Sequence, residues 1–455
     1  MTTDTALRPW EALKALAEAG DSKRLEKYMT AIGPSEAFRA LLRLAPEEQE
    51  RVLTTLSPED AAELIEEIPE EHAADIIEQM DAKAAASILN EMESDEQADV
   101  LAEMGAEDAA AIVAEMDPEE AADVVELIRY PHFSAGGLMM TEYFAYPETL
   151  SVGGALDDLS ARAAEEAVGQ EAHVYVVSSS GALVGVLDLR DLVLTARTTR
   201  LADVLKSPLY VGAETDLDDL EEFFDRHDFH AVPVVDARQR LIGMVRRSAV
   251  EEALTEHADQ DFLKSQGIIG GDEIRTMPIL TRARRRLSWL SLNIVLNIIA
   301  ASVIAFYEDT LRAVIALAVF LPIVSDMSGC SGNQAVAVSM RELSLGIVKP
   351  FEVVRVWLQE VSVGMINGTV LGCLIAGVAW AWKGNPYLGL VVGGALAANT
   401  VLAVSIGGTV PLLLKRWNVD PAVASGPILT TVTDMCGFFL VLGFATIMLS
   451  HIAMP

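Results

Sequence analysis

Cysteine, histidine and the aromatic residues are scarce in this chain of 455 residues. It has three cysteines, seven histidines and 6% aromatic residues. The cysteines (Cys330, Cys373 and Cys436) all fall in long apolar runs near the C-terminal end. The polar part therefore has neither a disulfide framework nor a cysteine-based zinc site. No nucleophile–base pair, P-loop or metal-hydrolase motif occurs either, which argues against an enzyme.

Positive charge is also in short supply. The chain has 33 Lys and Arg against 67 Asp and Glu, a net charge of −34. Only eight acidic and seven basic residues lie in 287–455, so nearly all the excess negative charge lies in 1–286. This excludes nucleic acid and anionic lipid surfaces as partners of the polar part, and it favours cations. A solvated acidic helical surface is the plainer explanation.

Long apolar runs are confined to the C-terminal third of the chain. Each reaches the roughly 20 residues that cross a bilayer, so five transmembrane helices surrounded by lipid are predicted. The second and fourth runs contain glycine and proline, which predicts kinks or unwound turns at membrane depth. The runs are Leu287–Tyr307, Ala313–Val338, Val361–Trp382, Leu388–Leu414 and Pro427–Ser450.

Lysine and arginine concentrate on one side of these runs. The loops on that side hold Arg282, Arg284, Arg285, Arg286, Arg341, Lys349, Arg355, Lys415 and Arg416. The opposite loops hold only Arg312 and Lys383. Because basic loops stay in the cytoplasm, we expect a multi-pass protein of the inner (plasma) membrane with its N-terminus cytoplasmic and its C-terminus outside.

Residues 45–128 repeat every 12 residues. Within each unit the apolar residues are three or four apart, which is one face of a helix, and proline or an acidic residue restarts each helix. Such short helices cannot bury an apolar face alone, so a stacked solenoid is predicted. The last apolar position of the unit recurs at Leu56, Ile68, Met80, Met92, Met104, Met116 and Ile128.

A longer duplication occupies residues 138–255. His173–Val177 followed by Leu183–Val186 recurs 58 residues later as Ala231–Val235 followed by Leu241–Met244. Each copy reads as helix, strand, turn, strand and helix. The pattern resembles a tandem pair of CBS modules, whose start matches Leu138–Thr141.

CBS pairs often hold ATP or another adenine nucleotide, with an aspartate on the ribose. Asp191 follows Gly185–Leu187 and matches that aspartate, whereas Ala249 stands at the equivalent position of the second copy. A second nucleotide site is therefore not expected, and a nucleotide-free structural pair is the other possibility.

Asp434 is the one ionisable residue in the run Pro427–Ser450. A carboxylate at this depth costs several kcal/mol or more unless it faces protein, water or an ion, so it indicates an ion path. The alternative is a helix-packing aspartate hydrogen-bonded to nearby serine or threonine.

The order of these parts resembles the MgtE magnesium channels over essentially the whole chain. Motifs in the spans strengthen the resemblance: Pro322–Gln334 with its Gly-Asn-Gln sequence, Gly407–Pro411, Val419–Ala422, and Thr433–Asp434 followed by Gly437. The resemblance implies a multidomain membrane protein with an α-helical solenoid (1–131), an α/β tandem CBS pair (132–255), a connecting (plug) helix (256–286) and a five-helix transmembrane pore domain (287–455).

The resemblance also implies a homodimer with its pore on the two-fold axis. Asp434 matches the family's pore acid, and Asn333 and Gly437 would offer oxygen atoms beside it. Mg²⁺ suits such a site because it prefers oxygen ligands and sheds water reluctantly. Asp326 departs from the family pattern, and it is either another ion ligand or part of a turn at membrane depth. Gly426 replaces a polar residue that the family often has near the inner mouth.

In this family cytosolic Mg²⁺ closes the pore by bridging acids of the solenoid, the CBS pair and the connecting helix. The positions that match are Glu214, Asp216 and Asp228 in the second CBS module and Asp261 in the connecting helix, with Glu256 and Asp259 beside it and Glu91 or Asp95 in the solenoid. The leading interpretation is thus a gated Mg²⁺ importer. The alternatives are a transporter of Co²⁺ or Ni²⁺, or a CBS membrane sensor that moves no ion.

Overall fold

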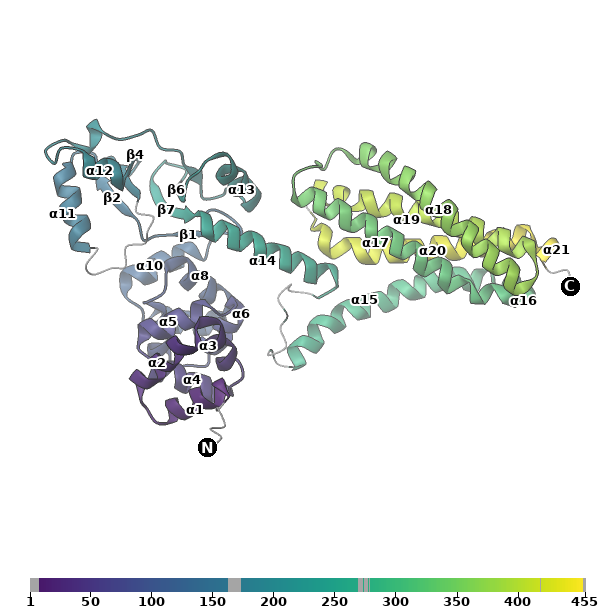
Figure 1. The fold of residues 1–455 in the computed structure, drawn as a ribbon, viewed down its shortest axis with the longest axis horizontal. Coiled ribbons are helices and arrows are strands. Elements are labelled where there is room, and N and C mark those ends of the chain that lie inside the picture. Colours follow the sequence, from purple (N-terminus) through teal and green to yellow (C-terminus); the bar gives the residue numbers. More distant parts are fainter. Residues whose placement is uncertain are drawn as a thin grey trace, which may run out of the picture. The chain divides into compact units, whose positions relative to one another are not determined.

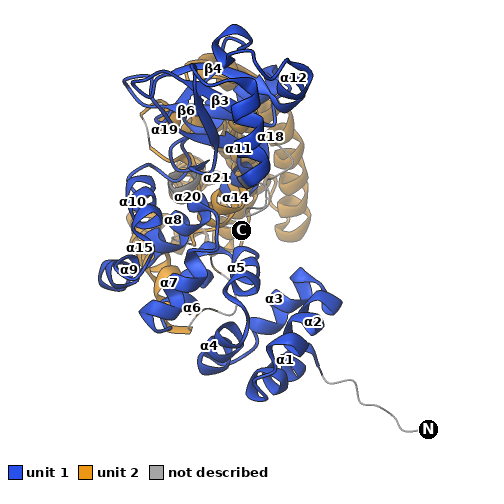
Figure 2. Ribbon diagram, turned by 90° about the vertical axis from the view of Figure 1, so that its left-hand side faces the viewer, with its two compact units in different colours: residues 1–257 blue, residues 258–455 orange. Residues whose placement is uncertain are grey.

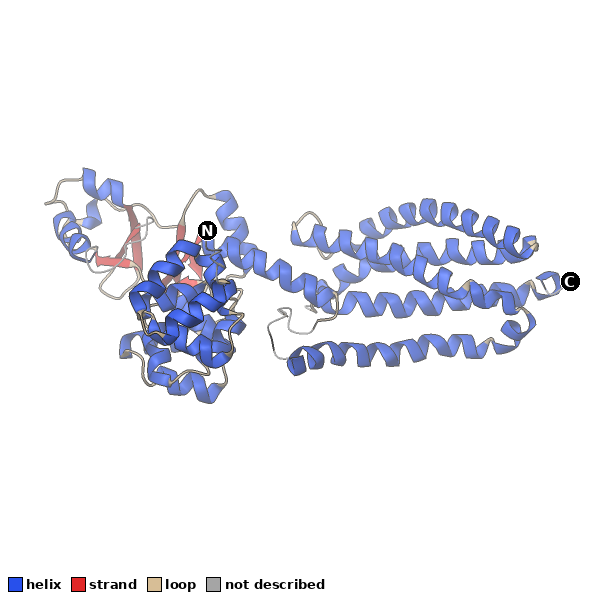
Figure 3. Ribbon diagram, turned by 60° about the horizontal axis from the view of Figure 1, so that its bottom comes forward, coloured by secondary structure: helices blue, strands red, loops and turns tan. Residues whose placement is uncertain are grey.

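The computed structural model describes residues 8–162, 173–268, 273, 277, 279–417 and 419–452. The chain divides into two compact units, Met1–His257 and Ala258–Pro455 (Figure 2). Each unit has its own hydrophobic core. The first combines helices with two small sheets, and the described residues of the second form helices and connecting turns (Figure 3).

Short helices build the N-terminal part of the first unit (Figure 1). Proline stands in the first turn of several of them, where its missing N–H is not needed and its fixed φ favours a helix. Ser57 caps one by accepting a 3.2 Å hydrogen bond from the Asp60 N–H. The helices are α1 (Pro9–Glu18), α2 (Ser22–Ile32), α3 (Pro34–Leu41), α4 (Pro46–Thr55), α5 (Pro58–Glu66), α6 (Glu70–Ile77), α7 (Ala82–Leu89), α8 (Ser94–Glu103), α9 (Ala106–Val113) and α10 (Pro118–Leu127).

Alternate helices of this array contact one another: α5 packs on α7, α7 on α9, α6 on α8 and α8 on α10. The closing apolar position of each 12-residue unit is buried from Leu56 to Met116, which confirms the predicted solenoid. Ile128, the last position of the repeat, is instead 38% exposed. The repeat thus defines the core of the array except at its end.

The duplicated segment forms two sheets. The first has the strand order β2 (Phe144–Pro147), β3 (His173–Val177), β4 (Leu183–Asp188). The second has the order β1 (Met139–Met140), β7 (Leu241–Arg246), β6 (Ala231–Val235), β5 (Val211–Gly212). The helices here are α11 (Val152–Arg162), α12 (Leu189–Leu194), η1 (Leu201–Asp203), α13 (Leu217–Arg226) and α14 (Arg247–Ser265).

The two sheets repeat one hairpin. Val176 pairs with Gly185 in β3–β4, and Val234 pairs with Gly243 in β6–β7, so the register is the same after 58 residues. The strand β1, which precedes the first module, pairs with β7 of the second. Helix α14 begins at Arg247, so the predicted start of the connecting segment at residue 256 lies within a helix.

The second unit contains five helical segments long and apolar enough to cross a membrane, as predicted. They are Ile279–Phe306, Ile315–Ser344, Val353–Lys383, Pro386–Arg416 and Leu429–Ile447. The corresponding elements are α15 (Ile279–Phe306), η2 (Ile315–Val319) with α17 (Leu321–Ser344), α18 (Val353–Lys383), α19 (Pro386–Arg416) and α20 (Pro421–Ile447). The short helices α16 (Glu308–Ala313) and α21 (Leu449–Ile452) complete the unit.

Kinks or unwound turns were predicted in the second and fourth spans, and the unwound turns are absent from the described residues of α17 and α19. Helix α17 runs through the Gly-Asn-Gln sequence without a turn, and α19 is continuous with Pro411 inside it. A Cβ atom on Gly407 would lie 2.3 Å from the Gly332 carbonyl oxygen. These glycines therefore allow two helices to touch rather than breaking them. An irregular start to the second span does exist, as the 3₁₀ helix η2.

Candidate functional site

A cavity of about 640 Å³ lies within the second unit. Its wall comes from α15, α16, η2, α17 and α20. The α17 residues that line it are three or four apart, from Pro322 to Asn333, because they share one face of that helix. The lining residues are Ile304, Leu311, Ala318, Leu321, Pro322, Ser325, Asp326, Gly329, Cys330, Asn333, Thr430, Asp434 and Phe438.

Asp434, Asp326 and Asn333, three residues expected at an ion site, meet in this cavity. The Ser325 hydroxyl of α17 donates a hydrogen bond to Asp434 Oδ1 of α20. A hydrogen bond from serine is what we expect if Asp434 only packs two helices together. The Asp434 carboxyl, however, also lines a cavity together with a second acid, Asp326. Two carboxylates close together at membrane depth repel each other unless a cation or a proton lies between them.

Among apolar neighbours, the cavity has a set of polar side chains that carry oxygen. Its polar side chains are Ser325, Asp326, Asn333, Thr430 and Asp434, all with oxygen atoms that can face a cation or the water around it. Hard ions such as Mg²⁺ prefer such ligands. Cys330 adds one sulfur to the wall, which a softer metal would prefer.

Gly437 is not among the residues that line the cavity. A Cβ atom there would lie 2.8 Å from the amide nitrogen of Asn399. Asn399, in α19, is fully buried, and its amide donates a 3.0 Å hydrogen bond to the Thr433 carbonyl, one residue before Asp434. Its Oδ1 atom has no hydrogen-bond partner in the described structure. Sequence analysis missed Asn399, although a lone amide side chain in an apolar span was a visible signal.

The expected sensor acids are spread over both units. Glu214, Asp216, Asp228 and Glu91 are exposed in the first unit. The Asp216 side chain caps α13 by accepting a 2.9 Å hydrogen bond from the Asp219 N–H. Glu256 lies 3.3 Å from a ring nitrogen of His132. Asp259 and Asp261 lie on the part of α14 that belongs to the second unit.

Sequence analysis named Asp95 as a candidate acid of the solenoid but missed its neighbours Glu93 and Glu96. Arg246 of β7 pairs with Glu93 and lies 3.6 Å from Asp95. Burial raises the pKa of Asp95 to about 7, although Arg246 opposes the shift. Burial, reinforced by Asp95 and Asp99, raises the pKa of the Glu96 carboxyl to about 9. The sequence does not distinguish these acids from the others, because every unit of the 12-residue repeat carries acidic residues.

Asp191, the expected ribose ligand, lies on α12 and forms a 2.6 Å ion pair with Lys206. Lys206 also pairs with Asp188 at 2.7 Å. Lys206 therefore lies between two carboxylates, and the Asp191 carboxylate already has a cationic partner in this structure.

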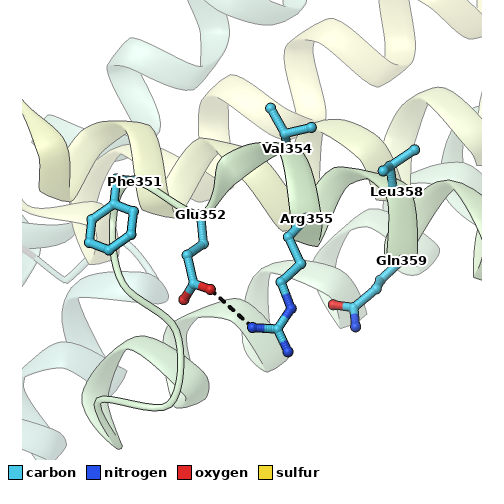
Figure 4. A pocket seen from close by; sticks show the side chains of 6 residues that line it. All are labelled: Phe351, Glu352, Val354, Arg355, Leu358 and Gln359. Atoms are coloured by element: carbon cyan, nitrogen blue, oxygen red, sulfur yellow. Dashed lines mark hydrogen bonds and ion pairs between the residues drawn. The ribbon is translucent and has the colours of Figure 1, made fainter.

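A second cavity, of about 580 Å³, lies at the start of α18 (Figure 4). Its wall includes the exposed apolar side chains of Phe351, Val354 and Leu358. The Glu352 carboxylate accepts a 3.0 Å hydrogen bond from Arg355 within it. This surface resembles the interfacial end of a span more than an ion site.

Comparisons with known proteins agree with this architecture. The model of the MgtE divalent cation transporter family matches residues 321–444, that of the MgtE intracellular N domain matches 32–132, and that of the CBS domain matches 201–256. The magnesium transporter MgtE of Bacillus subtilis (strain 168) is 34% identical over 321 residues, 70% of each chain. That of Thermus thermophilus is 34% identical over 333 residues, 72% of this chain and 73% of the relative.

A solved structure, the cytosolic domain of the Mg²⁺ channel MgtE in complex with ATP, is 31% identical. It covers 54% of this chain and 99% of its own, with a TM-score of 0.48. The family models fall on the solenoid, the duplicated segment and the spans in the order in which the structure has them. The chain therefore belongs to the MgtE family of divalent cation transporters.

Proposed function

We propose that this protein is a Mg²⁺-selective, channel-like importer that cytosolic Mg²⁺ closes. The observation that carries the proposal is the cavity in the membrane unit, where Asp434 and Asp326 lie with Asn333 and Ser325. A hydrated Mg²⁺ keeps most of its water shell, so oxygen-bearing side chains and carboxylates around a roomy space suit it. The names of the relatives, magnesium transporters, support the same ion.

The functional form we propose is a homodimer in the inner membrane, with the N-terminus in the cytoplasm and the C-terminus outside. Two copies would bring two sets of the Asp434 and Asp326 carboxylates to one ion. The excess of basic residues on one side of the spans supports the orientation. We further propose an adenine nucleotide at the CBS pair near Asp191, because a related cytosolic domain was solved with ATP.

The proposal that Mg²⁺ closes the pore is based on the excess of acidic residues in 1–286, the part of the chain that precedes the spans. An ion shifts an equilibrium only by as much as it binds one state more tightly than the other. Acids that repel each other when empty and share an ion when it binds supply that difference. We assign this role to Glu214, Asp216, Asp228, Glu256, Asp259 and Asp261, with Glu91 from the solenoid.

Transport of Co²⁺ or Ni²⁺ remains the second candidate, and one observation favours it. Cys330 lines the same cavity as Asp434, and thiolate ligands select softer metals than Mg²⁺. A CBS sensor that moves no ion is less well supported, because an anchor has no need of acids around a cavity at membrane depth.

Ion flux into liposomes tests the proposal. The full chain is reconstituted, Mg²⁺ entry is followed with an internal dye, and Co²⁺ and Ni²⁺ are offered in parallel. We expect Mg²⁺ entry that falls as internal Mg²⁺ is raised into the millimolar range. Asp434→Asn removes the charge at nearly constant shape and should reduce entry at least ten-fold.

Asp309→Asn is the matched control, because Asp309 is exposed and does not line the cavity. It should transport as the unaltered protein does. Equal flux in the Asp434 variant would remove this residue from the ion path. Flux that is indifferent to internal Mg²⁺ would contradict closure but not transport, and faster entry of Co²⁺ or Ni²⁺ would favour the second candidate.

A further inference from the structure

One histidine and three carboxylates converge in the first unit. Glu70 begins α6, Asp99 lies in α8, His132 follows α10 and Glu256 lies in α14. Ligand atoms of Glu70, His132 and Glu256 all lie within 4.8 Å of one another. Segments far apart in the sequence thus bring nitrogen and oxygen ligands to one place.

Asp99 orients the histidine ring. The Nδ1 atom of His132 lies 2.9 Å from Asp99 Oδ1, and Nε2 lies 3.3 Å from Glu256 Oε2 and 4.0 Å from Glu70 Oε1. In metal sites a carboxylate commonly accepts the hydrogen bond of one ring nitrogen and fixes the other toward the ion.

The ligand spacing also fits a metal ion. Two ligands of one tetrahedral ion, each about 2.1 Å from it, lie about 3.4 Å apart. His132 and Glu256 already have this separation. Glu70 Oε1 lies 4.0 Å from the same ring nitrogen, so rotation of its side chain must bring it closer to complete the set.

The charges in this group do not balance. Burial and the nearby Asp99 raise the pKa of the Glu70 carboxyl. Burial alone would lower the pKa of His132, but hydrogen bonds to Asp99 and Glu256 outweigh it and raise that pKa to about 11. Three acidic side chains thus surround one imidazole ring, and acids gathered in a partly buried place are costly to ionise unless a cation binds among them.

We propose that Glu70, His132 and Glu256 bind a transition-metal dication of the Zn²⁺ class, with Asp99 as the positioning residue for the ring. Imidazole nitrogen suits Zn²⁺, Co²⁺ and Ni²⁺, whereas Mg²⁺ takes oxygen ligands. The ion displaces the proton on Nε2 as it binds. The side chains of Glu70, His132 and Glu256 are 29%, 30% and 38% exposed, so an ion can reach them. None of these residues belongs to a span, and the site shares only Glu256 with the acids proposed to close the pore.

Zinc binding to the purified full chain tests this site. The protein is stripped of metal with a chelator and titrated with Zn²⁺ by calorimetry in millimolar Mg²⁺. We expect one tight site per chain, weakened at least ten-fold in His132→Gln and in Glu70→Gln. Asp99→Asn should weaken it roughly ten- to hundred-fold, as is usual for a partner that orients a ligand.

His257→Gln is the matched control. His257 follows Glu256 in α14, and its ring lies 4.9 Å from that of Phe133, centroid to centroid, outside the ligand group. Its zinc affinity should equal that of the unaltered protein. Circular dichroism shows whether each variant folds.

X-ray absorption at the zinc edge identifies the ligands directly in the unaltered protein. The unaltered protein should show oxygen ligands with the scattering of an imidazole ring, and folded His132→Gln should lose the ring. An oxygen-only shell, unchanged affinity in His132→Gln, or no binding in millimolar Mg²⁺ would overturn the proposal. His132 would then be an imidazolium that bridges Asp99 and Glu256.

Discussion

At the scale of single residues, the role of Asn399 depends on where its amide is buried. Replacing it by leucine keeps the volume but removes the hydrogen bond to the Thr433 carbonyl. A buried group left without its partner costs about 1–3 kcal/mol. Because Asp434 follows Thr433 in α20, we expect Asn399→Leu to lower Mg²⁺ flux per folded protein several-fold.

The control for this variant is Asn297→Leu. Asn297 is exposed on α15, and its amide bonds only to the Asn293 carbonyl of the same helix, at 2.9 Å. It should leave the flux in liposomes and the melting temperature in detergent unchanged. If Asn399→Leu behaves in the same way, Asn399 does not position the Asp434 segment.

The residues in and around the proposed ion site differ in how readily they can be predicted from the sequence. Asp434 was named from sequence because a lone carboxylate in an apolar span has few explanations, and its role in an ion path stays a prediction. Asn333 and Asp326 were named beside it, and the structure brings all three to one cavity. Gly437 was named too, but it faces Asn399 instead. Which side of a helix a residue occupies relative to its neighbours is a tertiary fact.

At the scale of elements, α18 and α19 pack closely through glycines. Gly364, Gly368 and Gly372 are four residues apart on α18, and a Cβ atom on Gly372 would lie 2.6 Å from the Gly393 carbonyl oxygen of α19. Gly372→Ala must therefore push the helices apart, at a cost of about 1–3 kcal/mol. We expect a lower melting temperature in detergent, measured by circular dichroism.

Gly377 of α18 provides the comparison, because a Cβ atom there meets nothing within 4 Å. Gly377→Ala should leave the melting temperature unchanged or raise it slightly, since alanine favours a helix over glycine. Equal melting of the two variants would mean that the contact between α18 and α19 does not limit stability.

The glycines also explain the largest error in the sequence analysis. Glycine and proline in the second and fourth spans were interpreted as kinks or unwound turns, yet the described residues of α17 and α19 contain no unwound turn. Glycine is favoured both in tight turns and where two helices contact each other closely, so its presence in a span does not tell the two apart. Only the neighbouring helix, unknown from sequence, distinguishes the two.

At the scale of the whole molecule, the excess of acid should make stability depend on pH. Burial raises the pKa of Glu96 to about 9 and that of Asp95 to about 7. When folding raises the pKa of a carboxyl group, the folded state keeps its full stability only below the pKa that the group has in the unfolded chain. This stability is lost as the pH rises toward and through the pKa in the folded state. We therefore expect the metal-free chain to melt at a lower temperature at pH 9.5 than at pH 6, by roughly 2–4 °C for each kcal/mol lost.

Thermal melts of the full chain in a chelating buffer measure this dependence. Glu96→Gln cannot ionise, so it should reduce the difference between the two pH values. The control Glu107→Gln lies at the exposed start of α9 and should keep the full difference. A melting temperature that rises between pH 6 and pH 9.5 would contradict the assigned shifts.

The sequence by itself determined the order of the parts. The 12-residue period, the 58-residue duplication and five apolar runs each depend on local patterns that only one kind of element satisfies. Tertiary structure decided what these patterns leave open. It paired β1 with β7, set glycines of α18 against α19, joined Asn399 to the Thr433 carbonyl and gathered Glu70, His132 and Glu256. Such contacts join residues tens to hundreds of positions apart, and no local period encodes them.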